Sequence, residues 1–237
     1  MNYRKLILPG AILIFFLITG SASGQNISDT DQNAPEKIKG LFIGGQASTN
    51  GLGFNLRYVF GKRVTIKSGV ESLNLNYSFQ FDENDISYNA DFNYKTGGIF
   101  LMADYFYTNS LYFTGGAIFN DFQPRLEGMA NSDMQYGDIT IPASKVGGFN
   151  MQFEPELKIS PYAGIGFRKF LGKKKMVTYN FETGLYYIGP PQLTIDATGL
   201  LAPTADPAHG KKQFLENQFS VYKYYPVVKL AIAMRLF

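Results

Sequence analysis

The chain has 237 residues, enough for one large domain, and 16% of them are aromatic although tryptophan is absent. It contains no cysteine, which excludes disulfides, thiol chemistry and thiolate metal sites. The formal net charge of +3 includes Arg4 and Lys5; without these two it is +1, which gives no support for nucleic-acid binding, and the mean hydropathy of −0.10 excludes a bundle of membrane helices.

The N-terminus has the three parts of a secretory signal peptide. Arg4 and Lys5 precede an apolar run over 6–19, and the small residues GSASG follow at 20–24. The alternative is a membrane anchor, but the run is shorter than the ~20 apolar residues that a spanning helix needs. We therefore expect a cleaved signal peptide over 1–24. Residues 25–37 are polar and are predicted to form a flexible leader.

From residue 38 onward, apolar and polar residues alternate with a period of two, which predicts strands. Within 64–81 the apolar parity changes, and we expect a β-bulge near Glu71 and Ser72 to restore a single apolar face. A long connection over 129–148 is predicted to hold a short strand at 138–142, and a second over 198–224 leads into a short helix within 212–225. The eight predicted strands are 38–47, 52–60, 64–81, 86–107, 111–119, 151–167, 177–187 with a continuation toward 197, and 225–237.

The lengths of the connections alternate along the chain. The turns FGKR, YTNS and LGKKK are short, whereas the connections between them, at 82–85, 129–148 and 198–224, are mostly longer. Outer-membrane barrels place short turns in the periplasm and longer loops outside the cell. The even strand number also places both ends of the barrel, residues 38–237, on the periplasmic side.

Charged residues recur on the strand faces opposite to the apolar rows, and this pattern fits two folds. In a membrane barrel they line a lumen closed by ion pairs, whereas in a soluble β-sandwich they face water. Asp104 is the most informative, because a carboxylate within so apolar a strand must find a cation. Two interpretations of Asp104 are open. In the structural one it forms an ion pair that holds the barrel closed, and in the functional one it acts as a gate or binding group. The candidate partners are Arg57, Lys67, Lys229 and Arg235. The full set of candidate lumen ion-pair residues is Asp104, Arg57, Lys67, Glu154, Arg168, Glu182, Lys229 and Arg235, with Glu156 and Lys158 on the same parity.

Several short motifs, in their order and spacing, carry a resemblance to a family. They are GLG at 51–53, DY at 104–105, PYAGIG at 161–166, GPP at 189–191 and YPVV at 225–228. Over roughly residues 50–237 the chain resembles the small outer-membrane β-barrels of Gram-negative bacteria, the OmpW-like and OmpA-barrel-like group. The terminal Phe237 is also typical of such barrels, although it lies off the apolar row of its strand. The resemblance implies an all-β fold, an eight-stranded antiparallel transmembrane barrel, and brings no catalytic residues with it.

The sequence shows no sign of catalysis, a cofactor or a metal site. His209 is the only histidine, and it has no nearby nucleophile or second ligand. Eight strands enclose room only for side chains or one small ligand, so we expect no general porin activity. The predicted role is structural or surface-interacting, in an exported, outer-membrane, monomeric protein that contacts membrane lipid and the barrel-assembly machinery and binds no nucleic acid.

Two alternatives stay open at this point. One is OmpW-like passage or binding of a small hydrophobic ligand, in a groove that Leu126, Met129, Leu200 and Leu201 would line. The other is a soluble periplasmic β-sandwich binding protein, in which Leu56, Ile165 and Ile232 would meet in a dry interior. Tyrosines near strand ends are expected to form interfacial girdles. These are Tyr58, Tyr77, Tyr94, Tyr107, Tyr187 and Tyr225.

Overall fold

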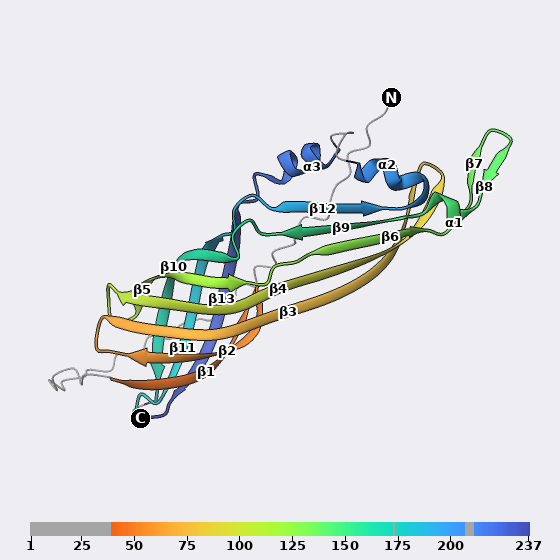
Figure 1. Ribbon diagram of the computed structural model, residues 1–237. Helices are drawn as coiled ribbons and strands as arrows, with labels where there is room; N and C mark the ends of the chain where they lie inside the picture. The colour runs from red at the N-terminus through yellow and green to blue at the C-terminus, as the bar shows by residue number, and fades with distance from the viewer. Residues whose placement is uncertain (1–38, 173, 207–210) are drawn as a thin grey trace, which may run out of the picture. The chain divides into compact units, whose positions relative to one another are not determined.

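The computed structural model describes residues 39–172, 174–206 and 211–237, all within the unit Lys37–Phe237. The predicted signal peptide, the leader and His209 lie outside the described residues. Eight antiparallel strands pair in a closed ring (Figure 1). In ring order they are β1 (Gly40–Ser48), β2 (Gly51–Val59), β3 (Val64–Glu83), β4 (Ile86–Phe106), β5 (Leu111–Asn120), β10 (Ile159–Leu171), β11 (Val177–Tyr187) and β13 (Tyr224–Arg235). The predicted number of ring strands is confirmed.

The ring closes where the first strand meets the last. β1 pairs with β13 in a register that runs from Phe42 opposite Arg235 to Ser48 opposite Lys229. Because every ring strand then has two neighbours, no sheet edge remains within the ring. Closure also creates a lumen, so that alternate residues of each strand point inward and outward.

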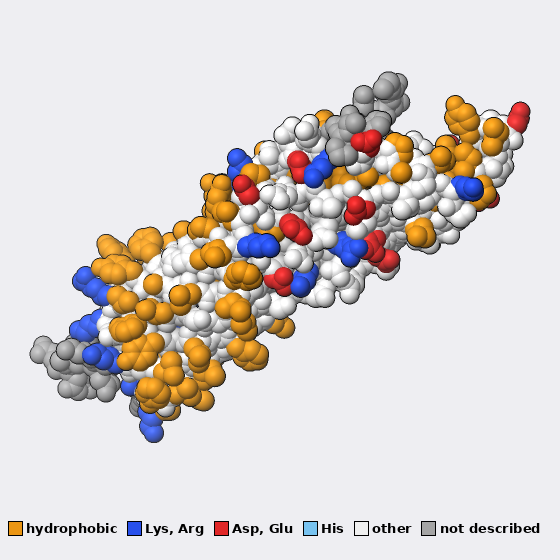
Figure 2. Space-filling model, viewed as in Figure 1, with side chains coloured by type: hydrophobic (Ala, Val, Ile, Leu, Met, Phe, Trp, Pro, Cys, Tyr) orange, Lys and Arg blue, Asp and Glu red, His pale blue; other side chains and the backbone are white. Residues whose placement is uncertain are grey.

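The outward face of the ring is apolar. Each strand contributes at least one exposed large apolar side chain: Ile43, Leu56, Val70, Leu101, Phe113, Ile165, Phe181 and Leu230 in ring order. On the face seen in Figure 2, hydrophobic side chains gather over the ring end of the molecule, with few charges between them. Leu56, Ile165 and Ile232 are 48%, 56% and 59% exposed. They do not meet in a dry interior, so the β-sandwich interpretation is wrong.

β3 and β4 are about twice as long as most other ring strands and continue beyond the ring (Figure 1). There β4 pairs with β6 (Arg125–Ala130), which pairs with β9 (Gly148–Glu154), which pairs with β12 (Gln192–Ala197). We call this part of the same eleven-stranded sheet the extension: β3 after Ser72, β4 before Gly97, and β6, β9 and β12. It is accompanied by a hairpin, β7 (Met134–Tyr136) and β8 (Ile139–Ile141), and by the helical segments α1 (Ala143–Val146), η1 (Gly199–Leu201), α2 (Ala202–Ala205) and α3 (Lys211–Phe219).

The predicted bulge at Glu71 and Ser72 is absent. β3 and β4 pair without interruption from Val64 opposite Tyr105 to Glu83 opposite Ile86. The apolar residues therefore change sides: in the ring they point outward, and in the extension they occupy the face that continues the lumen side. In both strands the apolar residues change sides at the same level of the sheet, because Ser72 of β3 lies opposite Gly97 of β4.

The apolar face of the extension has a core of its own, which explains the change of sides. Ile86, Tyr88, Ala130 and Val146 are buried together, and Phe81 and Phe149 pack against them. The ring of Tyr88 stacks on Phe81, with 5.2 Å between centroids. A bulge would have turned these residues toward solvent and lost their burial.

Four further predictions for the later part of the chain are corrected or confirmed. The strand expected over 151–167 is two strands, because Pro155 cannot donate to a ladder and β9 ends at Glu154. The continuation of β11 toward 197 is wrong as well: β11 ends at Tyr187, and after a Gly-Pro-Pro turn β12 joins β9. The short strand predicted at 138–142 is β8 and the short helix is α3. No helix among the described residues is long and apolar enough to cross a membrane.

If the extension has its own core, Tyr88→Ala should loosen it and leave the ring intact. Removing the buried aromatic side chain of Tyr88 should lower the local stability of the extension by about 3 kcal/mol. Trypsin should therefore cleave faster after Arg125 and Lys145. The control is Tyr136→Ala, whose side chain is exposed. Equal cleavage rates in the two variants would contradict the separate core, and a gel assay of heat-dependent migration reports on the ring.

Candidate functional site

Seven charged side chains lie buried inside the ring, each no more than 6% exposed. They come from six strands, β2, β3, β4, β10, β11 and β13, and we call them the lumen cluster. Four are basic and three are acidic. The members are Arg57, Lys67, Arg168 and Lys229 with Glu71, Asp104 and Glu182. Six of the eight predicted lumen residues belong to it.

The lumen cluster contains two centres of ion pairing. In the first, Lys67 lies between two carboxylates: its Nζ is 2.8 Å from Asp104 Oδ1 and also contacts Glu182 Oε2. In the second, Lys229 Nζ is 3.1 Å from Glu71 Oε1. Of the four cations considered for Asp104, the structure pairs it with Lys67. Burying these charges is tolerable because each carboxylate has an ammonium partner. Glu71 and Glu182 also accept further hydrogen bonds, whereas Asp104 Oδ1 has none among the described residues.

Tyrosine hydroxyl groups supply many of those further bonds. Tyr112 and Tyr162 each donate to a carboxylate oxygen of Glu182 at 3.0 Å. Tyr186 donates to Glu71 Oε1 at 3.3 Å and accepts from Lys229 Nζ at 2.7 Å. These rings also fill the lumen, so the same side chains exclude water and solvate the buried carboxylates.

The two arginines are held differently. Among the described residues neither Arg57 nor Arg168 has a carboxylate within ion-pairing distance. Arg57 donates from Nε to Asn55 Oδ1 at 2.7 Å. Arg168 donates from Nη1 to Thr65 Oγ1 at 3.0 Å and lies over the Phe106 ring, 3.8 Å from its centroid. Positive charge is therefore in excess in the lumen cluster.

Two predicted lumen residues, Glu154 and Arg235, are not in the cluster. Glu154 is the last residue of β9 and lies in the extension, because the strand ends before Pro155 and the ring strand β10 begins only at Ile159. Its side chain accepts a hydrogen bond from Gln152. Arg235 is the last residue of β13, and its Nη2 donates to the Lys39 carbonyl at 2.8 Å. Glu156 and Lys158 are exposed in the link between β9 and β10.

Glu71 is the acid that the sequence analysis missed. The predicted bulge would have turned Glu71 away from the lumen. Glu71 shares the parity of Thr65 and Lys67, and this parity alone would have predicted that it points into the lumen. Its carboxylate accepts hydrogen bonds from Gln46 at 2.8 Å and Asn50 at 2.7 Å in addition to Lys229. The inward tyrosines were missed as well, because only surface girdles were considered for tyrosine.

The tyrosines predicted for girdles fall into two groups. Tyr58, Tyr107 and Tyr187 are exposed on the ring strands or at their ends, and Tyr77 is exposed in the extension. Tyr94 and Tyr225 instead meet at the junction of the ring and the extension, with 3.0 Å between their hydroxyl oxygens, and pack with Phe122. Burial, together with the hydrogen bond to Tyr225, raises the pKa of Tyr94 above its ordinary value.

Within the lumen cluster lies a cavity of only about 10 Å³. That volume has room for roughly one water molecule. The residues that line it are Gln46, Arg57, Lys67, Phe100, Met102, Tyr112, Asn180, Glu182, Lys229 and Ala231.

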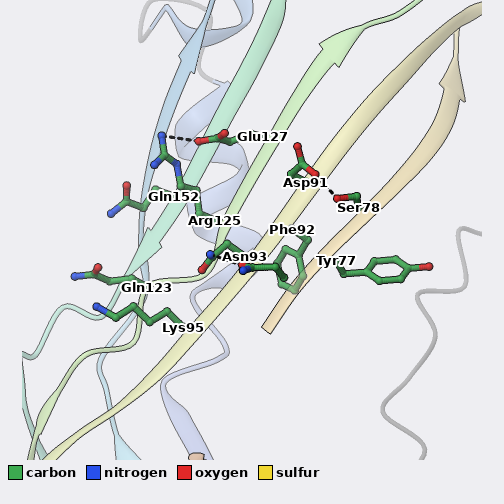
Figure 3. A pocket seen from close by; sticks show the side chains of 11 residues that line it. Tyr77, Ser78, Asp91, Phe92, Asn93, Lys95, Gln123, Arg125, Glu127 and Gln152 are labelled. Carbon is green, nitrogen blue, oxygen red and sulfur yellow. Dashed lines mark hydrogen bonds and ion pairs between the residues drawn. The ribbon is translucent and has the colours of Figure 1, made fainter. Parts of the chain in front are cut away.

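A larger, open groove of about 600 Å³ lies on the outer face of the extension (Figure 3). Its lining is mixed: it includes Tyr77 and Phe92 among mostly polar residues, and it carries two acids and two bases. Arg125 points to Glu127, with 2.6 Å between Nη2 and Oε1, whereas the Tyr77 ring points away from the other side chains. The remaining polar lining residues are Asn76, Ser78, Asp91, Asn93, Lys95, Gln123 and Gln152.

Neither a metal site nor the predicted apolar groove is present in the part of the chain that the structure describes. No group of three potential metal ligands is found there. The four leucine and methionine residues proposed for a hydrophobic ligand are not brought together. Leu201 packs against the core of the extension and Leu200 is exposed, while Met129 lies on the opposite, polar face beside Asn89 and Asp91.

Two solved structures share this fold. The crystal structure of Acinetobacter baumannii CarO2 matches with a TM-score of 0.55 and 19% identity, over 83% of this chain and 98% of that chain. The crystal structure of Acinetobacter baumannii CarO matches with a TM-score of 0.53 and 20% identity, over 84% of this chain and 98% of that chain. No family model and no curated protein matches the sequence. At these identities the likeness is one of fold, and it agrees with the eight-stranded ring.

The ion pair between Glu71 and Lys229 should contribute strongly to stability. Glu71→Gln leaves a buried ammonium group without its carboxylate and should lower the free energy of unfolding by about 3 kcal/mol or more. Adding Lys229→Met should recover part of that loss, measured by urea unfolding in detergent. Glu127→Gln, in the exposed pair with Arg125, should cost less than about 1 kcal/mol. Equal effects of the two glutamine variants would contradict the assignment.

Proposed function

We propose that the protein is an integral outer-membrane β-barrel with a lumen filled by side chains, and that it serves a structural or surface-interaction role without catalysis. One observation carries the proposal: the ring is apolar outside and charged inside. Apolar side chains are exposed on all eight strands, while the seven charges of the lumen cluster are buried. This is the inverse of a soluble barrel and matches a lipid-facing one.

The level at which β3 and β4 change their apolar side supports a membrane boundary there. On the ring side of Ser72 and Gly97, the outward residues include Val70, Ile99 and Leu101. On the extension side, the outward face carries the polar groove. The ring strands are long enough to span: β1 and β2 have 9 residues each and β13 has 12. A tilted transmembrane strand needs about 9–11 residues.

The arrangement of the connections supports an orientation. The short links over 60–63 and 107–110, and the described residues 172 and 174–176 of a third link, lie at one end of the ring, and the extension begins at the other end. In outer-membrane barrels this places the extension outside the cell. The similarity to the crystal structures of Acinetobacter baumannii CarO2 and CarO supports the barrel fold on which this orientation depends.

The narrow cavity supports a lumen that does not conduct. The cavity between Arg57, Phe100 and Tyr112 has a volume of about 10 Å³, which is too small for a solute larger than a water molecule. The surface role then belongs to the extension, whose polar groove has mixed donors and acceptors suited to a hydrophilic contact. In this proposal the protein is a monomer, and its partners are membrane lipid and the barrel-assembly machinery. No observation favours passage of a hydrophobic ligand, because the residues proposed for it lie on different faces.

Cell fractionation tests the proposal directly. The protein should sediment with the outer membrane, and an unheated sample should migrate differently from a heated one because a closed barrel resists detergent. In planar bilayers it should give no large, stable conductance steps. Recovery in the soluble periplasmic fraction would overturn the location, and steady porin-like steps would overturn the filled lumen.

A matched pair of leucine variants tests the membrane boundary. Leu101 and Leu75 are both exposed, at 61% and 54%, but Leu101 lies in the apolar ring and Leu75 in the extension. Leu101→Arg should destabilise the barrel in lipid vesicles by about 2–4 kcal/mol, whereas Leu75→Arg should cost little. Equal, small effects would show that water surrounds both positions.

A further inference from the structure

The structure assigns a site for a single halide ion, chloride in the natural setting, to the cavity inside the lumen cluster. We infer this site from the charges, the unused hydrogen-bond donors and the size of the cavity. The inference depends on the interior of the ring and not on its membrane insertion, and it adds a resident ion to the proposed non-conducting barrel.

The charges around the cavity favour an anion. Three cationic side chains, Arg57, Lys67 and Lys229, line it, and Glu182 is the only carboxylate among the residues that do. The whole lumen cluster repeats this excess, with four bases and three acids. An uncompensated charge is costly to bury, and an ion of the opposite sign within the cavity removes that cost.

The hydrogen-bond donors around the cavity also lack acceptors. Arg57 uses only Nε, so its two terminal nitrogen atoms form no hydrogen bond with the described residues. Lys67 Nζ has three N–H groups and two carboxylate partners, which leaves one donor. A guanidinium and an ammonium group that converge on one cavity can both donate to a single spherical acceptor.

The size and shape of the cavity select the ion. About 10 Å³ holds one particle of the size of a water molecule, which excludes phosphate, sulfate and carboxylates. Chloride is somewhat larger than water, but Met102 lines the cavity and its flexible side chain can yield. Water would accept the same hydrogen bonds but would leave the excess positive charge uncompensated.

The first experiment uses the wild-type protein alone. Crystals grown in sodium bromide should show an anomalous scattering peak within hydrogen-bonding distance of the Arg57 guanidinium. In detergent at constant ionic strength, chloride or bromide should raise the unfolding temperature in a saturable way, and gluconate, which is too large for the cavity, should not. A solvent peak without anomalous signal, together with an unfolding temperature that ignores halide, would show that the cavity holds water.

Variants separate the cavity from general effects of salt. Arg57→Gln removes one charge-assisted donor and should weaken halide binding about tenfold or more. Arg63→Gln, in an exposed turn, should bind halide like the wild type. An equal response of both variants would overturn the site in favour of surface screening. If Arg57→Gln does not fold, the bromide crystal decides alone. Heat-dependent gel migration in chloride-free buffer reports the barrel separately, so loss of the halide site would leave the proposed function standing.

Discussion

The pairing of β1 with β13 is the constraint on which the rest of the structure depends. It joins the first described strand to the last and removes both edges of the ring, so that the inward residues of eight strands share one narrow lumen. Polar groups in that lumen cannot reach bulk solvent, and they must satisfy one another. The network around Glu71, Asp104 and Glu182 is the result: each carboxylate is matched by an ammonium group from another strand, so the buried pairs tie together strands that are far apart in sequence.

β3 and β4 show how one pair of strands serves two environments without a change of register. Side chains alternate strictly along both, so the exchange of apolar and polar residues at Ser72 and Gly97 reverses which face is apolar. Within the ring the apolar face points outward and the lumen holds the charges. In the extension the apolar face gains its own cover, from Val146 among others, and the outward face is free to be polar. A bulge would have kept one apolar side along the whole hairpin and exposed the core of the extension.

The parity of the strands predicted most of the ring and six members of the lumen cluster, because side-chain direction in a strand depends only on position. It failed where a second assumption was added. Glu71 was lost to the assumption that an apolar row must stay on one side. Glu154 was wrongly included because the row from Met151 to Phe167 was taken as one strand, although Pro155 interrupts the ladder. Parity also gives no distances, so the choice of Lys67 as the partner of Asp104 had to come from the ring geometry. The extension could not be predicted from the sequence, since its strands β6, β9 and β12 are short and are stabilised by contacts between segments distant in sequence.

The inward tyrosines depend on glycine in a way that no alternation reveals. The Tyr112 ring lies against Gly166 and the Tyr162 hydroxyl against Gly184, and a Cβ atom at either glycine would overlap the tyrosine. These gaps let two large rings lie flat in a lumen of eight strands and still reach the carboxylate of Glu182. The hydroxyl groups of Tyr112 and Tyr162 and the ammonium group of Lys67 donate hydrogen bonds to Glu182. The carboxylate of Glu182 therefore has its partners without a guanidinium group. Arg57 is left with unused donors beside a small cavity, and the three cations that line this cavity face a single carboxylate, that of Glu182.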